Sequence, residues 1–594
     1  MVVSSPARSM ARFYLSPYLV ESGENREREA DMQTTRWISA WILFIFLATS
    51  PLVQAAETAD WVVRNARIYT VNALSPWANA MAIKDKRLIL IGSEQEVDKL
   101  IGPDTRVEDA GGRLILPGFH DTHVHMALNA SKRHWCDVGY PQTLEATRSA
   151  ILSCITASKG KEWVLISNAN TAAFPKDGLP AGFLDDIISD RPLVIDAVHS
   201  SFVNSKAMRI AGINKTTLDP VNGMIVRDSS GTPTGTFRES AKLMMEDRIP
   251  RQTPEEFNRN LREVVAEMSR FGVVSVQELT SMLPVQFYDD ALKKGWLTTR
   301  VRYGQIVGSG DRTPSDKDVA NFILAGKHHQ SRWLNANTIK LYIDGDLGDQ
   351  TAAMMEPYEN SSERGEPIWT QEQLNIQVAK FDAAGMQLHL HAVGDRAISM
   401  ALDAIENSQR INGRRDARHQ ITHLHAISDQ DLPRFKQLGV IANVQPYFAT
   451  NIDYNTTRAL ELLGAERHRR MFRFKDLLEH GARVVVSTDS PVSPINPMVS
   501  IQAAMTRLEK GVDAPAFLPG QSLSLKEVIE AYTFGGAFAN FLDRDSGSLE
   551  VGKYADFVML DQNLFDIDAN RIDETQVILT VVEGEEVHRV KKQD

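Results

Sequence analysis

The middle of the chain alternates Val- and Ile-rich apolar runs with longer helical segments, and this alternation limits the fold more than any other feature. We expect eight strands, at residues 113–119, 272–279, 299–307, 337–344, 385–393, 418–426, 439–446 and 482–490. Strands separated by helices favour a parallel sheet, and eight of them predict a (β/α)8 barrel. A doubly wound open sheet is the alternative, although no GxGxxG motif follows a first strand.

The segment 253–272 carries the clearest helix signal. Thr253 and Glu256 have the spacing of a capping box, and Pro254 takes the first helical position. One apolar face is formed at helical spacing by Leu261, Val264, Val265, Met268 and Phe271. The segment is therefore predicted to be an amphipathic helix.

Short alternating strands are also expected at both ends of the globular part. They fall at residues 59–72 and 80–92, and again at 547–561 and 575–590. This pattern favours one β-sandwich built from residues 56–115 and 536–594, beside a barrel at residues 116–535.

The first two barrel strands are separated by about 145 residues, from Met126 to Phe271. Ordinary connections take only a few residues, so we expect an inserted subdomain at about residues 130–250. An insertion at this point leaves the barrel at its carboxyl-terminal face, where active sites of this fold form.

Residues 1–55 are expected to be an N-terminal extension and a signal peptide. From Met32, a second candidate initiator, one positive charge at Arg36 precedes an apolar stretch at 38–48 and the sequence "VQA" at 53–55. This pattern predicts an exported protein, periplasmic or secreted, with no stable membrane span after cleavage. An uncleaved N-terminal anchor is the alternative.

The net charge of the chain bears on its possible binding partners, and its two cysteines bear on the redox state of its compartment. A formal net charge of −11 disfavours nucleic acid as the main partner and says little else about partners; a small-molecule substrate is a separate expectation. The two cysteines, Cys136 and Cys154, can pair in an oxidising compartment, but two unpaired thiols fit the sequence equally well.

The stretch "LPGFHDTHVH" crowds His120, Asp121, His123 and His125 at the end of a predicted strand. Residues i and i+2 of a strand point to the same side, so His123 and His125 are expected to face the barrel mouth together. Two imidazoles on one side suit a divalent metal such as zinc, whereas two hydrogen-bonded histidines are the alternative.

Four further polar residues fall near the ends of other predicted strands. These are Lys340 in "NTIKLYIDGD", His391 in "LHLHAVGD", His423 in "RHQITHLHA" and Asp489 in "VVVSTDSP". Successive strands of one barrel bring their carboxyl ends to one face, so these side chains are predicted to converge with His123 and His125.

These motifs, with "HSSFVNSKAM", "AYTFGGAFA" and "GSLEVGKYADFVMLD", resemble the amidohydrolase superfamily nearly end to end. The resemblance is to amidohydrolase family 3, which includes N-substituted formamide deformylases. It implies a metal-dependent barrel with a flanking β-sandwich. It also implies hydrolysis of a non-peptide, amide-like C–N bond by water that the metal activates.

The resemblance further implies a ligand set for two divalent ions, expected to be zinc: His123, His125, His391, His423 and Asp489, with Lys340 as a carboxylated lysine that bridges them. A free ammonium has no lone pair, whereas a carbamate formed with CO2 offers an oxygen ligand. The alternative for Lys340 is an ion pair with Asp344 or Asp346. Asp489 is also expected to be the catalytic proton shuttle, with a helix N-cap as its alternative.

The sequence departs from the family pattern at several positions. Thr422 stands where many relatives carry a glutamate before the histidine, so that contact is lost or replaced. His389 and His425 are extra histidines, and either could replace its neighbour as a ligand. Asp346 and Asp349 suggest a cationic or amine-bearing substrate, although a solvated acidic loop explains them equally well.

Candidate substrate-binding residues are His199 and Asn204 in the predicted insertion, with a purely structural loop as the alternative; Gln445 and Arg507 are weaker candidates. Hydrolysis of an ester, lactone or carbamate would use the same site. A non-catalytic regulatory or binding protein on the same scaffold is the third interpretation.

Overall fold

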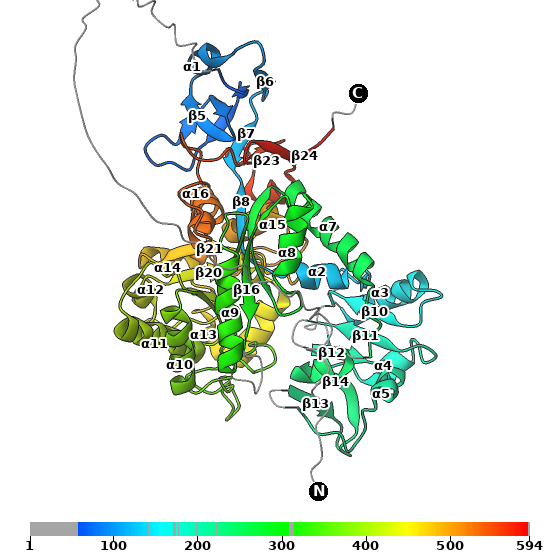
Figure 1. The fold of residues 1–594 in the computed structure, drawn as a ribbon. Helices are drawn as coiled ribbons and strands as arrows, with labels where there is room; N and C mark the ends of the chain where they lie inside the picture. The colour runs from blue at the N-terminus through cyan, green and yellow to red at the C-terminus, as the bar shows by residue number, and fades with distance from the viewer. Residues whose placement is uncertain are drawn as a thin grey trace, which may run out of the picture. The chain divides into compact units, whose positions relative to one another are not determined.

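The computed structural model describes residues 58–139, 143–169, 174–175, 178–197, 200–220, 223–246, 248–307 and 314–591 (Figure 1). The predicted extension and signal peptide, residues 1–55, lie outside these ranges. Within the described ranges, none of the helices combines the length and the apolar character needed to cross a membrane.

A sheet of eight parallel strands forms the centre of the fold (Figure 1). In order around the sheet these are β8 (Phe119–Val124), β15 (Val273–Thr280), β16 (Arg300–Ile306), β17 (Leu334–Tyr342), β18 (Gln387–Ala392), β19 (Gln420–His423), β20 (Ile441–Val444) and β21 (Arg483–Val486). Each strand pairs with its neighbour in parallel register. The predicted (β/α)8 barrel is confirmed.

Backbone hydrogen bonds join the end of the first barrel strand to the segment that follows the last one. The amide of Asp489 donates to the carbonyl of His123, and the amide of His125 donates to the carbonyl of Ser490, each at 2.8 Å. The segments that close the barrel are therefore the segments that carry three of the predicted metal ligands.

The predicted strand at 113–119 was wrong as a barrel strand. Its residues Leu114–Pro117 form β7, which belongs to the flanking sheet, and the barrel strand β8 starts only at Phe119. Gly118 separates the two strands because its Cα lies against Val274, where no side chain fits. His120 and His123 are consequently inside a strand, and only His125 follows its end.

Two further sheets are built from the residues that precede and follow the barrel in the sequence. One contains β5 (Arg87–Gly92), β4 (Ala80–Lys84), β1 (Trp61–Arg64) and β6 (Arg106–Asp109). The other contains β24 (Glu585–Arg589), β23 (Val577–Val582), β22 (Phe557–Leu560), β7, β2 (Arg67–Tyr69) and β3 (Trp77–Ala78), so it combines both chain ends. Trp61 and Phe557 join the two sheets with ring centroids 5.6 Å apart.

A further six-stranded sheet lies between β8 and β15 in sequence. Its order is β13 (Gly223–Arg227), β14 (Pro233–Glu239), β12 (Ser200–Val203), β11 (Leu193–Asp196), β10 (Val164–Ser167) and β9 (Cys136–Asp137). Helices α3 (Leu144–Ala157), α4 (Ala181–Asp185) and α5 (Ser205–Ala211) accompany it. A disulfide joins Cys136 of β9 to Cys154 of α3, which answers the pairing question that the sequence left open.

The remaining helices mostly follow barrel strands. They are α1 (Glu94–Val97), α2 (Met126–Lys132), α6 (Leu243–Glu246), α7 (Pro254–Arg270), α8 (Gln286–Lys293), α9 (Asp316–His328), α10 (Gln371–Ala383), α11 (Asp395–Asn412), α12 (Leu432–Leu438), α13 (Ala459–His468), α14 (Phe474–Glu479), α15 (Pro497–Thr506), α16 (Leu525–Glu530) and α17 (Gly536–Ala539). The predicted capping box of Thr253 and Glu256 opens α7.

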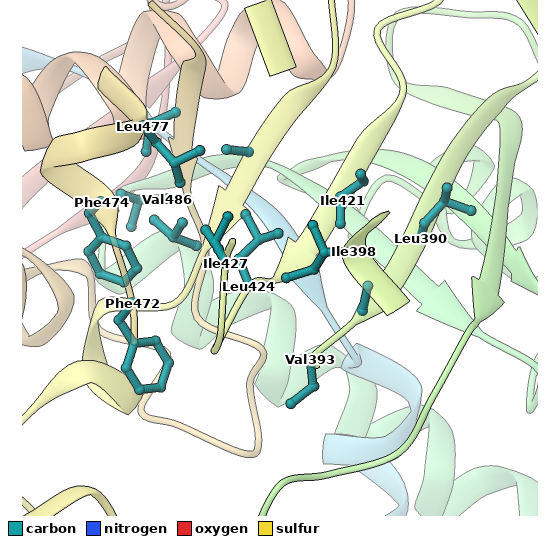
Figure 2. Packing of buried hydrophobic residues seen from close by; sticks show 14 of the residues in the cluster. Leu390, Val393, Ile398, Ile421, Leu424, Ile427, Phe472, Phe474, Leu477 and Val486 are labelled. Atoms are coloured by element: carbon teal, nitrogen blue, oxygen red, sulfur yellow. The ribbon is translucent and has the colours of Figure 1, made fainter. Parts of the chain in front are cut away.

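The largest apolar cluster packs barrel strands against helices, and Figure 2 shows part of it. Leu390 of β18 and Ile421 of β19 contribute to it from the sheet, and Ile398 and Leu477 contribute from α11 and α14. Because successive residues of a strand point to opposite faces, burial of Leu390 in this layer turns His389 and His391 into the barrel.

A buried ion pair ties the barrel to the flanking sheet. The Arg300 guanidinium contacts Asp556 at 2.9 Å and Glu583 at 3.2 Å, and Arg300 is only 2% exposed. Arg332 also contacts Glu583, but its side chain is 45% exposed.

We expect Arg300→Met to lower the free energy of unfolding by roughly 3–5 kcal/mol, because it leaves the buried Asp556 carboxylate without its cation and removes one of the two cations that contact Glu583. Arg332→Met is the matched control and should cost roughly 0–1 kcal/mol, as an exposed pair does. Denaturant titration of both variants measures the difference. Equal losses would mean that burial does not decide the strength of this contact.

Candidate metal centre

Three of the predicted ligands lie close enough to hold one ion. Nε2 of His125 and Nε2 of His123 approach Oδ1 of Asp489 at 3.0 and 3.3 Å. The candidate ligand atoms of all three residues lie within 4.8 Å of one another, and all three side chains are largely buried. A carboxylate and two imidazoles are the ligand types that zinc and similar ions accept.

The other two predicted histidines border this group. The ring centroids of His391 and His423 are 4.4 Å apart, and those of His423 and His123 are 5.1 Å apart. Nδ1 of His423 lies 4.0 Å from Oδ2 of Asp489. The predicted histidines from β8, β18 and β19 are thus brought together at the carboxyl ends of the strands.

An unusual backbone conformation turns His423 toward the group. Ile421 of β19 faces the outer apolar layer, so strict alternation would send His423 outward as well. His423 has a φ of 81° and the next residue, Leu424, a φ of 55°, which breaks the alternation. Such conformations are costly for residues other than glycine and gather at functional sites.

Hydrogen bonds fix the orientation of the imidazoles. Nδ1 of His125 donates to the carbonyl of Leu279 at 2.6 Å, and Nδ1 of His423 lies 3.1 Å from Oε1 of Gln445. A carbonyl oxygen can only accept, so these Nδ1 atoms carry a proton. Nε2 is then the nitrogen left to coordinate a metal, and for His125, whose Nε2 faces Asp489, this requires that no proton remain on Nε2. The histidines are held in the tautomer that a metal requires.

His123 is held in the same way by different partners. Its Nδ1 lies 3.0 Å from Oγ1 of Thr422 and 3.2 Å from Nε2 of His389. Nδ1 of His389 in turn faces Oε1 of Gln277 at 3.1 Å. Thr422 therefore replaces the contact that a glutamate supplies in many relatives, and His389 lies behind His123 as a support.

His425 lies apart from the group of three. Its ring packs on Phe472, with centroids 4.5 Å apart, and is 6.3 Å from the ring of His423. His391 is oriented by the carbonyl of Gly345, which lies 3.2 Å from its Nε2, so its Nδ1 has the lone pair.

Lys340 is fully buried, and its Nζ has no hydrogen-bond partner among the described residues. The ion pairs with Asp344 or Asp346, considered above, do not form. Asp344 instead accepts from the amides of Val393, Gly394 and Ala353 at 2.8–3.0 Å. Nζ of Lys340 lies 5.2 Å from the ring centroid of Tyr342, which itself is 4.8 Å from the ring of His391.

Burial governs the charge states in this region. It lowers the pKa of His123 and His423 well below the usual value, and the Lys340 charge adds to this. Burial also lowers the pKa of Lys340, to about 7. His125 is the exception, because the hydrogen bond to Asp489 and the carboxylate charge outweigh burial and raise its pKa. Neutral imidazoles are the form that binds a metal.

Glu278 is a residue that sequence reasoning missed. Its fully buried carboxylate accepts from the amides of Met126 and Ala127, directly after His125, and from the hydroxyl of Tyr288. It thereby fixes the start of α2 and the backbone that carries His125. The signal in the sequence was an acidic residue inside the apolar run 272–279.

The described contacts give no support to substrate binding by the two predicted substrate-binding residues. His199 lies outside the described residues. Asn204 caps α5, and its amide also contacts the backbone of Leu193, Ile188 and Arg191, so its described contacts hold the inserted sheet together.

The acidic loop after β17 is not freely solvated. Asp346 accepts from the hydroxyl of Tyr454 at 2.9 Å, and Asp349 lies 3.6 Å from Arg238 of the inserted sheet. Arg507 is fully buried and donates to the carbonyls of Phe472 and Phe517, a structural arrangement.

We expect Gln277→Leu to weaken metal binding by roughly 10–100-fold, because it removes the acceptor that orients His389 and, through it, His123. Titration of metal-free protein with zinc measures this. The matched control is Gln305→Leu, since the hydrogen bonds of the Gln305 side chain within the described ranges go to Tyr303, Thr280 and Ile306 and to no histidine. Equal affinities of Gln277→Leu and wild type would show that His123 needs no such support.

Comparison with known proteins places the chain in a family. A sequence model of the amidohydrolase family matches residues 106–588. The chain is 28% identical to protein LONG AFTER FAR-RED 3 of Arabidopsis thaliana over 555 residues, covering 90% of this chain and 92% of that protein. It is 26% identical to the N-substituted formamide deformylase of Arthrobacter pascens over 544 residues, covering 89% and 98%.

A solved structure supports the same fold. An uncharacterised metal-dependent hydrolase of Pyrococcus horikoshii superposes with a TM-score of 0.66 at 23% identity, covering 86% of this chain and 99% of that one. Because the family match spans most of the sequence and includes every residue of the candidate metal centre, the chain belongs to the amidohydrolase family.

Proposed function

We propose that this amidohydrolase is a zinc-dependent enzyme that cleaves a non-peptide, amide-like C–N bond of a small molecule. The observation that carries the proposal is the set of pre-oriented histidines around Asp489, beside a buried lysine amine with no partner. A binding or regulatory protein would have no need to hold three imidazoles in the metal-binding tautomer.

We assign His123, His125, His391, His423, Asp489 and Lys340 as the residues that would hold two divalent ions. When bound, the ions supply Lewis-acid chemistry that activates water and polarises the scissile carbonyl. Six candidate ligands are more than one tetrahedral ion uses, which supports a pair of ions.

Lys340 is proposed to carry a carbamate. Its neutral amine would form an N–C bond with CO2 and lose one proton, giving an anionic oxygen ligand. Complete burial, the absence of a carboxylate contact and a pKa of about 7 all favour a neutral amine at this position.

Asp489 is proposed to accept a proton from the attacking water and to return it to the leaving amine. Water adds to the carbonyl carbon, the C–N bond breaks, and an acid and an amine leave. A helix N-cap, the alternative for Asp489, does not apply, because the next helix begins at Pro497 with Asn496 as its cap. Ester, lactone or carbamate hydrolysis would use the same groups, and no described contact favours it.

We further propose that the protein is exported. The apolar stretch at 38–48 followed by "VQA" supports this, and so does the Cys136–Cys154 disulfide, since such bonds persist in oxidising compartments.

Wild-type protein is expected to contain two divalent ions per chain, and Lys340→Ala to lose at least one of them together with activity. Elemental analysis of purified protein measures the ions. Short carboxylic acids should partly restore activity by replacing the carbamate. Lys293→Ala, an exposed control, should behave as wild type. One ion per chain in both wild type and Lys340→Ala would refute the two-ion proposal.

Asp489→Asn is expected to reduce turnover by roughly 10²–10⁴-fold, because an amide cannot carry the proton. The backbone φ of Asp489 is 61°, a conformation that asparagine accepts readily, so the fold should be retained. Turnover, metal content and melting temperature are measured together. Near-normal turnover would remove Asp489 from the mechanism, and lost metal with lost turnover would leave it a ligand only.

A further inference from the structure

A cavity lies at the far end of α2 from the candidate metal ligand His125. It has a volume of about 560 Å³, within the range of sites that take small organic molecules. Three segments line it: residues 133–134 after α2, residues 161–165 around the start of β10, and residues 250–260, which lead into α7.

The charge of this cavity is opposite to that of the whole protein. Arg133, Lys161, Arg251 and Arg259 line it, against two carboxylates, Glu162 and Glu256. The Glu256 carboxylate is engaged in the cap of α7, where it accepts from the amide of Thr253 at 2.9 Å. A chain with a net charge of −11 therefore presents a local excess of cations here.

Two of the cations are available to a ligand. Arg133 is paired with Glu267. Lys161 and Arg259, by contrast, have no carboxylate within 4.0 Å in the described part of the chain, and both are exposed at the rim. A cavity whose lining cations outnumber its carboxylates favours an anion.

The inner wall is apolar and firmly held. Trp163, which is 5% exposed, lies there with Leu165 and Pro250. The neighbouring amides of Gln252 and Asn260 donate to the carbonyls of Ser131 and Ala130 at 2.9 and 3.2 Å, and so fasten the end of α2. Apolar lining residues beside exposed cations suit a molecule with an apolar body and one acidic group.

We propose that this cavity binds an organic anion, a carboxylate, sulfonate or phosphate attached to an apolar group, with Lys161 and Arg259 holding the charge and the apolar lining residues contacting the apolar body. The site is separate from the metal centre and does not depend on the reaction proposed there.

Naphthalene-2-sulfonate is a suitable probe, because a sulfonate is a poor metal ligand. Calorimetric titration of metal-free wild-type protein should give one equivalent bound. We expect the double variant Lys161→Glu/Arg259→Glu to bind at least roughly tenfold more weakly, since two attractive charges become repulsive. Neutral 2-naphthylmethanol should bind wild type at least roughly tenfold more weakly than the sulfonate.

The matched control is Lys317→Glu/Arg410→Glu, which makes the same change of net charge at exposed positions outside the cavity lining and should bind as wild type. The proposal is overturned if wild type does not bind the sulfonate, if the neutral analogue binds equally well, or if the Lys161/Arg259 variant keeps wild-type affinity. Equal weakening by both double variants would also overturn it, because the effect would then be one of net charge.

Discussion

The contact on which the site depends is the backbone closure between the first and last barrel strands. Two amide-to-carbonyl hydrogen bonds, Asp489 to His123 and His125 to Ser490, join segments that are more than 360 residues apart in sequence. The same bonds that remove the open sheet edge bring the Asp489 carboxylate against both imidazoles. Completion of the barrel and assembly of the three-residue group are one structural event.

A polar barrel interior supports this group from below. Gln277, Gln387, Gln420 and Thr338 exchange side-chain hydrogen bonds inside the barrel, and His389 connects them to His123. Buried polar groups are tolerated only when they find partners, and each amide here serves several. Burial of these polar side chains costs free energy. The cost is explained if the side chains hold the imidazole rings at the carboxyl ends of the strands in one tautomer.

Much of this arrangement could be predicted from the sequence. The alternating run "LHLHA" marks β18, and its inward histidines follow from period-two geometry. The capping box of α7 and the two-ended sandwich depend on equally local signals. Those signals fail where the backbone leaves regular geometry. Gly118 splits one apolar run between two sheets, and the positive φ of His423 reverses the side that its ring would otherwise face.

Contacts between residues far apart in the sequence could not be predicted either, because no local sequence pattern indicates them. Glu278 is recognisable only as an acid within an apolar strand, yet its carboxylate fixes the backbone after His125. For Lys340, the position in a barrel strand could be predicted, but its burial without a hydrogen-bond partner among the described residues could not. A lysine amine buried without hydrogen bonds is among the least stable arrangements a fold can contain. Nearby Asp344, the obvious counter-charge, is committed to three backbone amides. Among the described residues, Lys340 thus has no hydrogen-bonded carboxylate, although the Asp489 charge acts on it, and burial favours an amine that is neutral or has been converted into a ligand.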